Sequence, residues 1–256
     1  MRTGNRTFIF RGRHRATATV IALLVALPCA AAEGVLKEHA HNDVSNVASL
    51  QRGARNFVNY CMGCHSAQYV RYNRLAVDLQ MTESQLVSNL MFAADKPTDT
   101  MTIAMRTEDA RRWFGQEPPD LSLISRSKGP DYLYNFLHGF YLDPSRPTGV
   151  NNVALPNAAM PHVLWELQGL QRAVFVEEEH DGRKEQVFKG FNQVTPGKLG
   201  AEEYDQFVRD LVNFLAYVGE PIQLERQRLG VWVLVFLLVF GILAYLLKQE
   251  IWKDVK

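Results

Sequence analysis

The residues best suited to chemistry are two cysteines and a histidine that stand within five positions of one another. The segment reads Cys61-Met62-Gly63-Cys64-His65, a C-x-x-C-H motif. Two thiols at this spacing can each add to a vinyl group of haem, and the imidazole of the next residue is then held under the iron as its proximal ligand. The motif therefore predicts one covalently bound haem c.

Two other uses of paired cysteines fit this chain less well. A thioredoxin-like redox pair usually opens a helix after a buried strand, whereas the stretch before Cys61 has helical spacing. A structural zinc site needs four ligands, and there is no second cysteine pair to complete one. The third cysteine, Cys29, lies in a segment that we expect to be removed, so the mature chain would hold only the two haem thiols.

An electron carrier needs a second axial ligand on the far side of the iron, and a methionine thioether there stabilises Fe(II) and raises the potential. Met160 is the favoured candidate, because it lies in a proline-bounded loop, residues 155–161, late enough in the chain to close over the haem. Met81 and Met91 fit helices better as packing residues. Four alternatives stay open, although an isolated histidine more often packs or faces solvent: Met101, Met105, His138 and His162.

Targeting signals stand at both ends of the chain. Residues 1–32 hold five arginines and no acidic residue, then a 12-residue apolar run from Ala16 to Leu27 and a small-residue site before Glu33. These are the parts of a secretory signal peptide, and the apolar run is too short to span a bilayer. We expect cleavage after Ala32 and export, which suits a c-type haem because bacteria attach it after export.

A second apolar segment lies near the C-terminus. Residues 229–247 carry no charge and as a helix would extend roughly 28 Å, enough for one membrane span. The expected organisation is a signal peptide (1–32), a periplasmic haem domain (33–222), a transmembrane helix (229–247) and a cytoplasmic tail (248–256). The sequence therefore predicts a single-pass protein of the bacterial inner membrane, in contact with membrane lipid.

The pattern between the ends is mostly helical. Apolar residues at 3.6-residue spacing lead from a cap at Ser49 into Cys61. Capping residues and terminal glycines predict further helices in four segments: Thr82 to Met91, Thr107 to Gly115, Asp131 to Gly139 and Tyr204 to Val218. Long proline-rich stretches join them and are more plausible as a cofactor wall than as linkers.

An alternating polar segment from Phe175 to Phe191 predicts a surface hairpin that turns at Asp181-Gly182. Its acidic run, residues 177–179, is more simply a solvated hairpin tip than a site that steers a basic partner. Without residues 1–32 the chain would hold 23 basic and 27 acidic residues, a net charge of −4. No basic stripe suggests nucleic acid as a partner.

Short motifs follow one another in order along nearly all of the mature chain. They are Arg52-Gly53 and Phe57 ahead of the C-x-x-C-H motif, Tyr69 to Leu75, Met105-Arg106, Pro118-Pro119-Asp120-Leu121-Ser122, Asp131-Tyr132, Pro147-Thr148-Gly149, Asn157-Ala158-Ala159-Met160-Pro161 and Glu220-Pro221. In this order they resemble the cytochrome c1 family, the haem subunit of the quinol–cytochrome c reductase (cytochrome bc1) complex, in a proteobacterial form.

The resemblance implies a mostly α, cytochrome c-like haem domain with long loops and a small β-hairpin insertion, plus one C-terminal transmembrane helix. It implies Met160 as the axial ligand, with His65 on the other side of the iron. The cofactor-binding residues would then be Cys61, Cys64, His65 and Met160. It also implies that Pro118 and Pro119 wall the haem, and that a basic residue within 126–128 meets a haem propionate.

The chain departs from the family pattern at two places. Lys128 stands where the family commonly has Arg, and Lys cannot give the same bidentate grip on a carboxylate, so Arg126 and Lys128 both stay candidates for the propionate. His162 stands where a second proline is common, and we expect it to pack as a neutral ring against the haem edge. His39 and His41 resemble a metal pair by type, but we expect them to be solvated.

The implied activity is one-electron transfer. The chain would take an electron from the Rieske iron–sulfur protein and pass it to a cytochrome c, beside a cytochrome b subunit, with no catalytic acid, base or nucleophile of its own. The alternative is a monohaem subunit of another membrane oxidase or dehydrogenase. A haem enzyme or sensor would instead need an open iron position.

Overall fold

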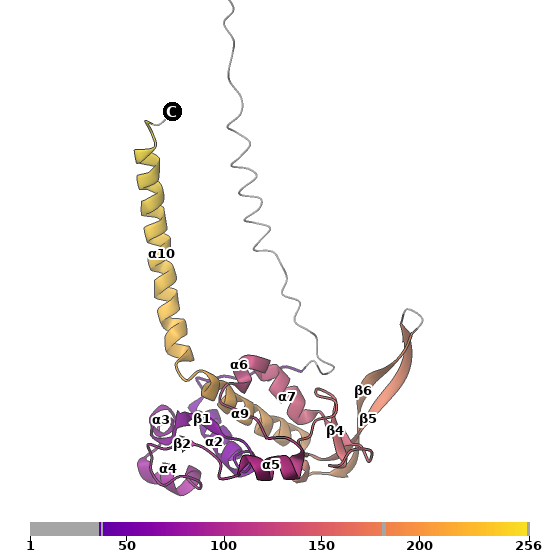
Figure 1. The fold of residues 1–256 in the computed structure, drawn as a ribbon. Helices are drawn as coiled ribbons and strands as arrows, with labels where there is room; N and C mark the ends of the chain where they lie inside the picture. Colours follow the sequence, from indigo (N-terminus) through magenta and orange to yellow (C-terminus); the bar gives the residue numbers. More distant parts are fainter. Residues whose placement is uncertain (1–35, 37, 181–182, 255–256) are drawn as a thin grey trace, which may run out of the picture. The chain divides into compact units, whose positions relative to one another are not determined.

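The computed structural model describes residues 36, 38–180 and 183–254, and within them it contains nine helices and three two-stranded antiparallel sheets (Figure 1). The predicted fold class is confirmed, because helices dominate, the strands form small hairpins, and one long apolar helix stands at the C-terminal end. The predicted signal peptide, residues 1–32, lies outside the described residues.

The core is built on the packing of α2 (Val47–Tyr60) against α9 (Ala201–Gly219). The two backbones come very close at Gly53, where an added Cβ would lie 2.0 Å from the carbonyl oxygen of Asp210. The rings of Phe57 and Phe214 then meet with their centroids 5.5 Å apart, and both are fully buried. Glycine is needed here because any side chain would force the helices apart.

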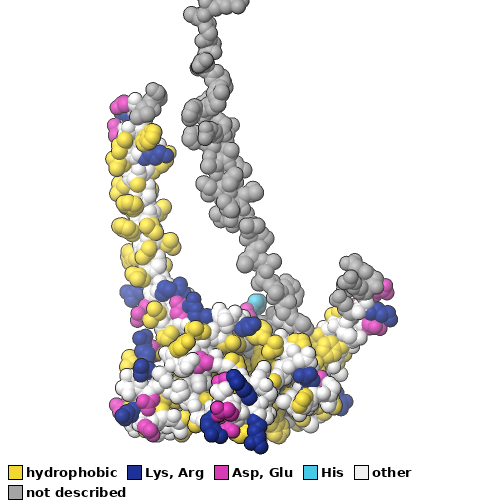
Figure 2. Space-filling model, viewed as in Figure 1, with side chains coloured by type: hydrophobic (Ala, Val, Ile, Leu, Met, Phe, Trp, Pro, Cys, Tyr) yellow, Lys and Arg dark blue, Asp and Glu magenta, His cyan; other side chains and the backbone are white. Residues whose placement is uncertain are grey.

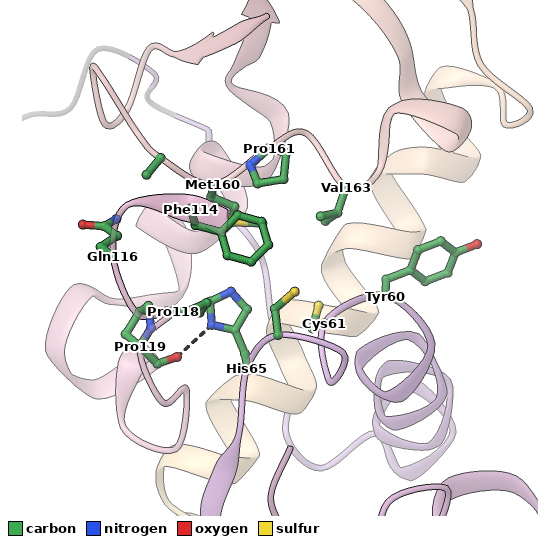
Figure 3. Close-up of a pocket in the computed structure, with 12 residues that line it drawn as sticks. Tyr60, Cys61, His65, Phe114, Gln116, Pro118, Pro119, Met160, Pro161 and Val163 are labelled. Carbon is green, nitrogen blue, oxygen red and sulfur yellow. Dashed lines mark hydrogen bonds between the residues drawn. The ribbon is translucent and has the colours of Figure 1, made fainter. Parts of the chain in front are cut away.

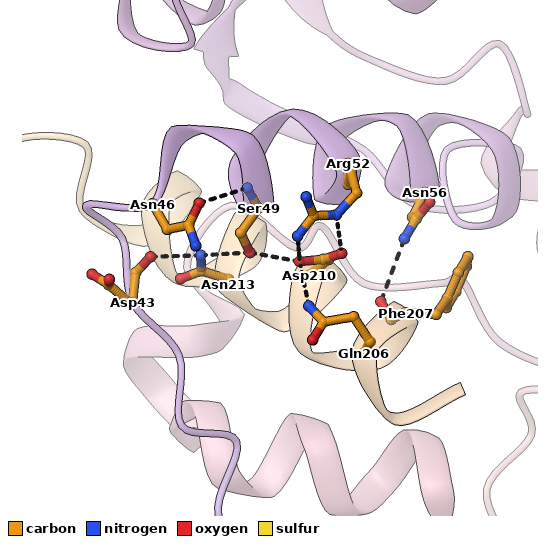
Figure 4. A network of polar contacts seen from close by, with 9 residues as sticks. All are labelled: Asp43, Asn46, Ser49, Arg52, Asn56, Gln206, Phe207, Asp210 and Asn213. Carbon is orange, nitrogen blue, oxygen red and sulfur yellow. Dashed lines mark hydrogen bonds and ion pairs between the residues drawn. The ribbon is translucent and has the colours of Figure 1, made fainter. Parts of the chain in front are cut away.

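A buried polar network holds the same two helices together (Figure 4). The carboxylate of Asp210 accepts two hydrogen bonds from Arg52, at 2.6 and 2.9 Å, and one from the hydroxyl of Ser49 at 2.7 Å. Gln206 donates to the same carboxylate at 3.0 Å, and Asn213 donates to Ser49 at 3.0 Å. The network satisfies a carboxylate that is almost fully buried, as the low polarity of a core requires.

Among the shorter helices, α4, α5 and α7 follow the predicted signals closely, whereas α3, α6 and α8 were not predicted. Thr82 and Gln85 form the predicted capping box at the start of α4, and the left-handed Gly115 ends α5. One start differs from the prediction: Asn46 caps α2 and accepts from the backbone N–H of Ser49, which lies inside the helix. The bounds are α3 (Tyr72–Asp78), α4 (Glu83–Leu90), α5 (Thr107–Phe114), α6 (Ile124–Lys128), α7 (Pro130–His138) and α8 (Trp165–Gln168).

The strands pair locally. β1 (Ala67–Arg71) pairs with β2 (Thr100–Met101), β3 (Phe140–Leu142) with β4 (Val150–Asn152), and β5 (Gly169–His180) with β6 (Arg183–Pro196).

The last hairpin is longer than the predicted Phe175 to Phe191. Its base is fastened to the domain by Gln171, whose amide donates to the carbonyl oxygens of His138 and Phe140 at 2.9 and 2.8 Å. Those partners lie about thirty positions earlier in the chain, so alternation alone could not reveal the extra length. Asp181 and Gly182, the predicted turn, lie outside the described residues.

The C-terminal helix α10 (Gln223–Ile251) is 29 residues long. Within the described part of the chain it is the one helix that is long and apolar enough to cross a membrane, and the domain buries none of its apolar stretch. Figure 2 shows hydrophobic side chains along this helix and basic side chains towards its two ends. The helix extends beyond the uncharged run 229–247 on both sides.

Candidate haem site

The C-x-x-C-H motif forms a tight turn directly after α2. The backbone N–H of Cys64 donates to the carbonyl of Cys61 at 3.0 Å, and that of His65 donates to the same oxygen at 2.9 Å. Both cysteines are free thiols. Burial, together with the neighbouring Cys64, raises the pKa of Cys61 to about 12, and burial also raises the pKa of Cys64. The folded chain therefore holds two neutral, unpaired thiols side by side.

The imidazole of His65 is oriented by a backbone oxygen (Figure 3). Its Nδ1 lies 2.7 Å from the carbonyl oxygen of Pro119, and a carbonyl can only accept, so Nδ1 carries the proton. Burial lowers the pKa of His65, although the hydrogen bond to Pro119 and the nearby Asp120 charge oppose that shift. The ring is thus neutral with the lone pair of Nε2 available for a metal.

The Pro119 carbonyl is itself held in place by the segment that follows the motif. The backbone N–H of Leu121 donates to the carbonyl of Ser66 at 2.8 Å, and the carboxylate of Asp120 accepts from the N–H of Gln68 at 3.0 Å. These hydrogen bonds hold the Pro-Pro-Asp-Leu-Ser element against residues 66–68. They thereby fix the carbonyl oxygen of Pro119, which sets the tautomer of His65.

Met160 lies near Cys61 and His65, although it belongs to a different part of the chain. It lies on the loop between β4 and α8 and lines two cavities, of about 70 and about 280 Å³, that His65 and Cys61 also line. Figure 3 shows His65 and Met160 converging on the smaller cavity, with Pro118 and Pro119 beside them. The structure thus brings Cys61, His65 and Met160 together at both cavities, with Cys64 at the smaller one.

The larger cavity has the character that a haem requires. Most of its wall is aliphatic or aromatic side chain, which suits the apolar macrocycle, and Lys128 supplies a cation to meet an anionic propionate. The wall comes from the Pro-Pro-Asp-Leu-Ser loop, α6, α7, the Met160 loop and α9; its apolar residues include Leu121, Ile124, Tyr132, Phe136, Ala158, Leu211 and Leu215. Two free thiols, an oriented imidazole and a thioether complete a donor set that fits haem c.

The structure separates the two basic candidates for the propionate. Lys128 lines the larger cavity and lies 5.7 Å from the centroid of the Tyr132 ring. Arg126 donates instead to Glu220, which also accepts from Arg226 at the start of α10. The two residues are two positions apart on α6, but of the two only Lys128 lines the larger cavity.

The other methionines lie elsewhere. Met101 is fully buried in the core and Met91 almost so, while Met81 packs against the same core. Met105 is half-buried, and neither it nor Met101 lines the two cavities.

The other histidines have partners or positions away from the cavities. Both ring nitrogens of His138 lie 2.9 Å from acceptors, one the Tyr134 carbonyl and the other Asp205. His162 is buried and stacks on Phe140 with the ring centroids 4.9 Å apart, so it lines neither haem cavity. Burial lowers its pKa to about 4, so the ring is neutral as expected, but it packs on Phe140 rather than at the cavity wall.

His39 and His41 are both exposed, and the ring of His39 is hydrogen-bonded to the carboxylate of Asp131 at 2.7 Å. Within the described residues no group of three or more His, Cys, Asp or Glu side chains is arranged to hold a metal.

Several residues of the site escaped sequence reasoning. Tyr60, Phe114, Gln116 and Val163 line the smaller cavity, and Leu211 and Leu215 of α9 line the larger one. The apolar pattern of α9 indicated only a buried face. Nothing local distinguishes a residue that packs on a protein side chain from one that packs on a cofactor.

Comparison with known proteins agrees with a covalent haem site. Residues 36–255 match the model of the Cytochrome C1 family. The chain is 52% identical to cytochrome c1 of Allochromatium vinosum over 238 residues, which cover 93% of this chain and 97% of the relative. It is 43% identical to the ammonia monooxygenase gamma subunit of Nitrosomonas europaea over 238 residues, 92% of this chain and 97% of that one. It is also 25% identical to cytochrome b/c1 of Bradyrhizobium diazoefficiens, covering 80% of this chain and 33% of the relative.

Proposed function

The chain belongs to the cytochrome c1 family, and from this premise we propose that it carries single electrons from the Rieske iron–sulfur protein to a cytochrome c. Family membership implies electron transfer within a cytochrome bc1 complex and one covalently bound haem c. The observation that carries the proposal of a haem electron carrier is the convergence of His65 and Met160 on an apolar cavity bordered by two free thiols.

The proposed site residues have different roles in holding the cofactor. Cys61 and Cys64 would hold haem c through thioether bonds, and His65 and Met160 would be the ligands of its iron. Haem c, when bound, supplies a one-electron Fe(III)/Fe(II) couple. With side chains as both iron ligands, the site would suit electron transfer and would not bind an external ligand.

The surrounding residues set the conditions of transfer. Pro119 fixes the orientation of His65 and strengthens its donor character through the hydrogen bond to Nδ1. The apolar wall excludes water, which limits reorganisation when the charge of the site changes. Lys128, at the edge of the cavity, is the residue that we assign to a haem propionate. None of these roles requires a catalytic acid or base.

The proposed placement is a haem domain in the periplasm with one membrane anchor. The match to the family begins at residue 36 and so leaves out the proposed signal peptide 1–32. The length and apolar surface of α10 support a membrane span around residues 229–247, between a periplasmic domain (33–222) and a cytoplasmic tail (248–256).

The proposed partners are cytochrome b, the Rieske protein and a cytochrome c acceptor. The name of one relative, cytochrome b/c1, joins the two cytochromes in a single protein, which supports an anchor that packs beside cytochrome b. Another relative is named as a gamma subunit of ammonia monooxygenase, so the partner complex is the claim that most needs a test. A monohaem subunit of a different membrane oxidoreductase is the alternative.

The test is to isolate the full-length chain from mildly solubilised native membranes and identify what accompanies it. We expect cytochrome b and the Rieske protein in fixed proportion, together with quinol oxidation that reduces cytochrome c. Isolation with monooxygenase, oxidase or dehydrogenase subunits, and without cytochrome b, would contradict the proposal and support the alternative.

A further inference from the structure

The loop that carries Met160 has no regular secondary structure between β4 and α8, yet it must hold one side chain at a defined place. Backbone N–H groups in such a loop need acceptors from elsewhere. Two adjacent asparagines at the end of β4, Asn151 and Asn152, supply them. Both are buried, Asn152 completely, and the function assignment above gives neither a role.

Asn152 organises the first part of the loop. Its side-chain oxygen accepts from the backbone N–H groups of Ala154 and Leu155, at 2.9 and 3.2 Å. Its amide nitrogen donates to the carbonyl oxygen of Phe136 in α7 at 2.8 Å. A backbone N–H can only donate, so the orientation of the amide is determined. The loop is therefore fastened to α7, a wall of the larger cavity.

Asn151 organises the second part. Its side-chain oxygen accepts from the backbone N–H groups of Asn152 and Asn157, at 2.9 and 2.7 Å, while its amide nitrogen donates to Asp143 at 2.9 Å. Asn157 has a left-handed backbone with φ of 66°, a conformation that a non-glycine residue keeps only when its surroundings hold it. Arg146 supports it further with a bond of 3.3 Å to its carbonyl oxygen.

The fastened residues lead directly to the ligand. Asn157 lies three positions before Met160, and the intervening Ala158 is buried and lines the larger cavity. Each asparagine uses both its oxygen and its nitrogen, so neither aspartate nor a smaller polar residue reproduces the whole pattern.

From these contacts we infer that Asn151 and Asn152 are positioning residues that hold the Met160 thioether over the iron. The inference rests on the proposed function, because it takes Met160 as an axial ligand. Weakening either amide lets the loop lift, which uncovers the iron. Each hydrogen bond lost shifts that open–closed equilibrium by about fivefold to tenfold.

The experiment compares full-length holoproteins carrying Asn151→Ala or Asn152→Ala with one carrying Asn213→Ala. Asn213 is an equally buried amide that makes two hydrogen bonds, to Asp43 and Ser49, in the α2–α9 network and lines neither cavity. Carbon monoxide binding by the ferrous protein and the midpoint potential report the methionine ligation, and chemical unfolding reports stability.

We expect the Asn151 and Asn152 variants to bind carbon monoxide at least about fivefold more than the unmodified protein and to have a lower potential. The Asn213 variant should lose stability and still exclude carbon monoxide. Equal carbon monoxide binding by all three variants, at matched stability, would overturn the inference. The variant Met160→Leu distinguishes failure of this inference from failure of the ligand assignment. If its ferrous form also excludes carbon monoxide, Met160 is not an iron ligand.

Two further measurements apply if an alanine variant yields no holoprotein. Asn151→Asp keeps the acceptor oxygens but places a second carboxylate against Asp143, so we expect carbon monoxide binding above that of the unmodified protein and below that of Met160→Leu. In the unmodified protein, the amides of Ala154, Leu155 and Asn157 should exchange slowly with solvent. Rapid exchange at all three would contradict the inference.

Discussion

His65 and Met160, the two proposed iron ligands, are positioned in different ways. His65 follows a helix and is oriented by one hydrogen bond to a nearby loop, and a five-residue motif is enough to propose it. The Met160 loop depends on Asn151 and Asn152, whose partners reach back to α7. Sequence reasoning could name the methionine from its loop and from resemblance, but it could not see what holds the loop.

Met160→Leu should lower the midpoint potential and let the ferrous protein bind carbon monoxide. Loss of the thioether removes the ligand that favours Fe(II), and axial ligands set haem potentials over roughly 0.8 V, so a fall of at least about 0.1 V is expected. Redox titration and carbon monoxide difference spectra measure both effects. Met101→Leu, a similar change in the core, is the control and should alter neither. An unchanged spectrum and potential in Met160→Leu would remove it as the ligand.

Arg126 and Lys128 show where local sequence stops being informative. Both are basic residues on the same short helix, and the sequence left them equivalent. The fold distinguishes them. Glu220, ninety-four positions away from Arg126, accepts a hydrogen bond from it, whereas Lys128 lines the larger cavity. A partner so distant in sequence cannot be assigned without the fold.

Lys128→Met should lower the midpoint potential, whereas Arg126→Met should leave it nearly unchanged. A cation beside the haem stabilises the reduced state, which carries one positive charge fewer than the oxidised state. Lys128 is exposed to solvent, so screening limits the expected shift to tens of millivolts, and added salt should reduce it. Redox titration at two ionic strengths provides the measurement. A larger shift for Arg126→Met than for Lys128→Met would reverse the assignment.

At the level of elements, the helices were the most predictable part of the fold. Capping residues and terminal glycines act on their own helix, so the bounds of α4, α5 and α7 followed from short patterns, whereas α9 begins three residues before the predicted Tyr204. The pairs β1–β2 and β3–β4 were not predicted, because strands of two to five residues are too short for a periodicity to be detected. They form where the tertiary fold brings the chain together.

Gly53→Ala should destabilise the protein strongly. The new methyl group would lie 2.0 Å from the backbone oxygen of Asp210 and 2.6 Å from Cβ of Phe214. Relief requires α2 and α9 to separate, at a cost of about 2–4 kcal/mol in the free energy of unfolding. Gly200→Ala is the matched control, because its added methyl group meets nothing nearer than 3.7 Å. Denaturant unfolding of both holoproteins measures the difference, and similar stabilities would argue against the tight crossing.

For the whole molecule, the haem domain has its own core and α10 adds no buried apolar residue to it. A chain that ends at Glu220 should therefore be exported, soluble and reducible by small chemical donors. It should lose reduction by quinol, because the anchor that we propose to pack beside cytochrome b is absent. Cell fractionation and haem reduction assays test this. Retention of the truncated chain in the membrane would instead reveal a second anchor.

The tight crossing of α2 and α9 also determines when the haem motif becomes enclosed during synthesis. Arg52 and Asp210 are 158 positions apart, and a chain is synthesised from its N-terminus, so nearly the whole domain must be made before α2 can pack against α9. In the folded domain Cys61 is buried. The long interval between the two helices is thus a period in which the C-x-x-C-H motif stays accessible to its cofactor, and packing of α9 against α2 ends it.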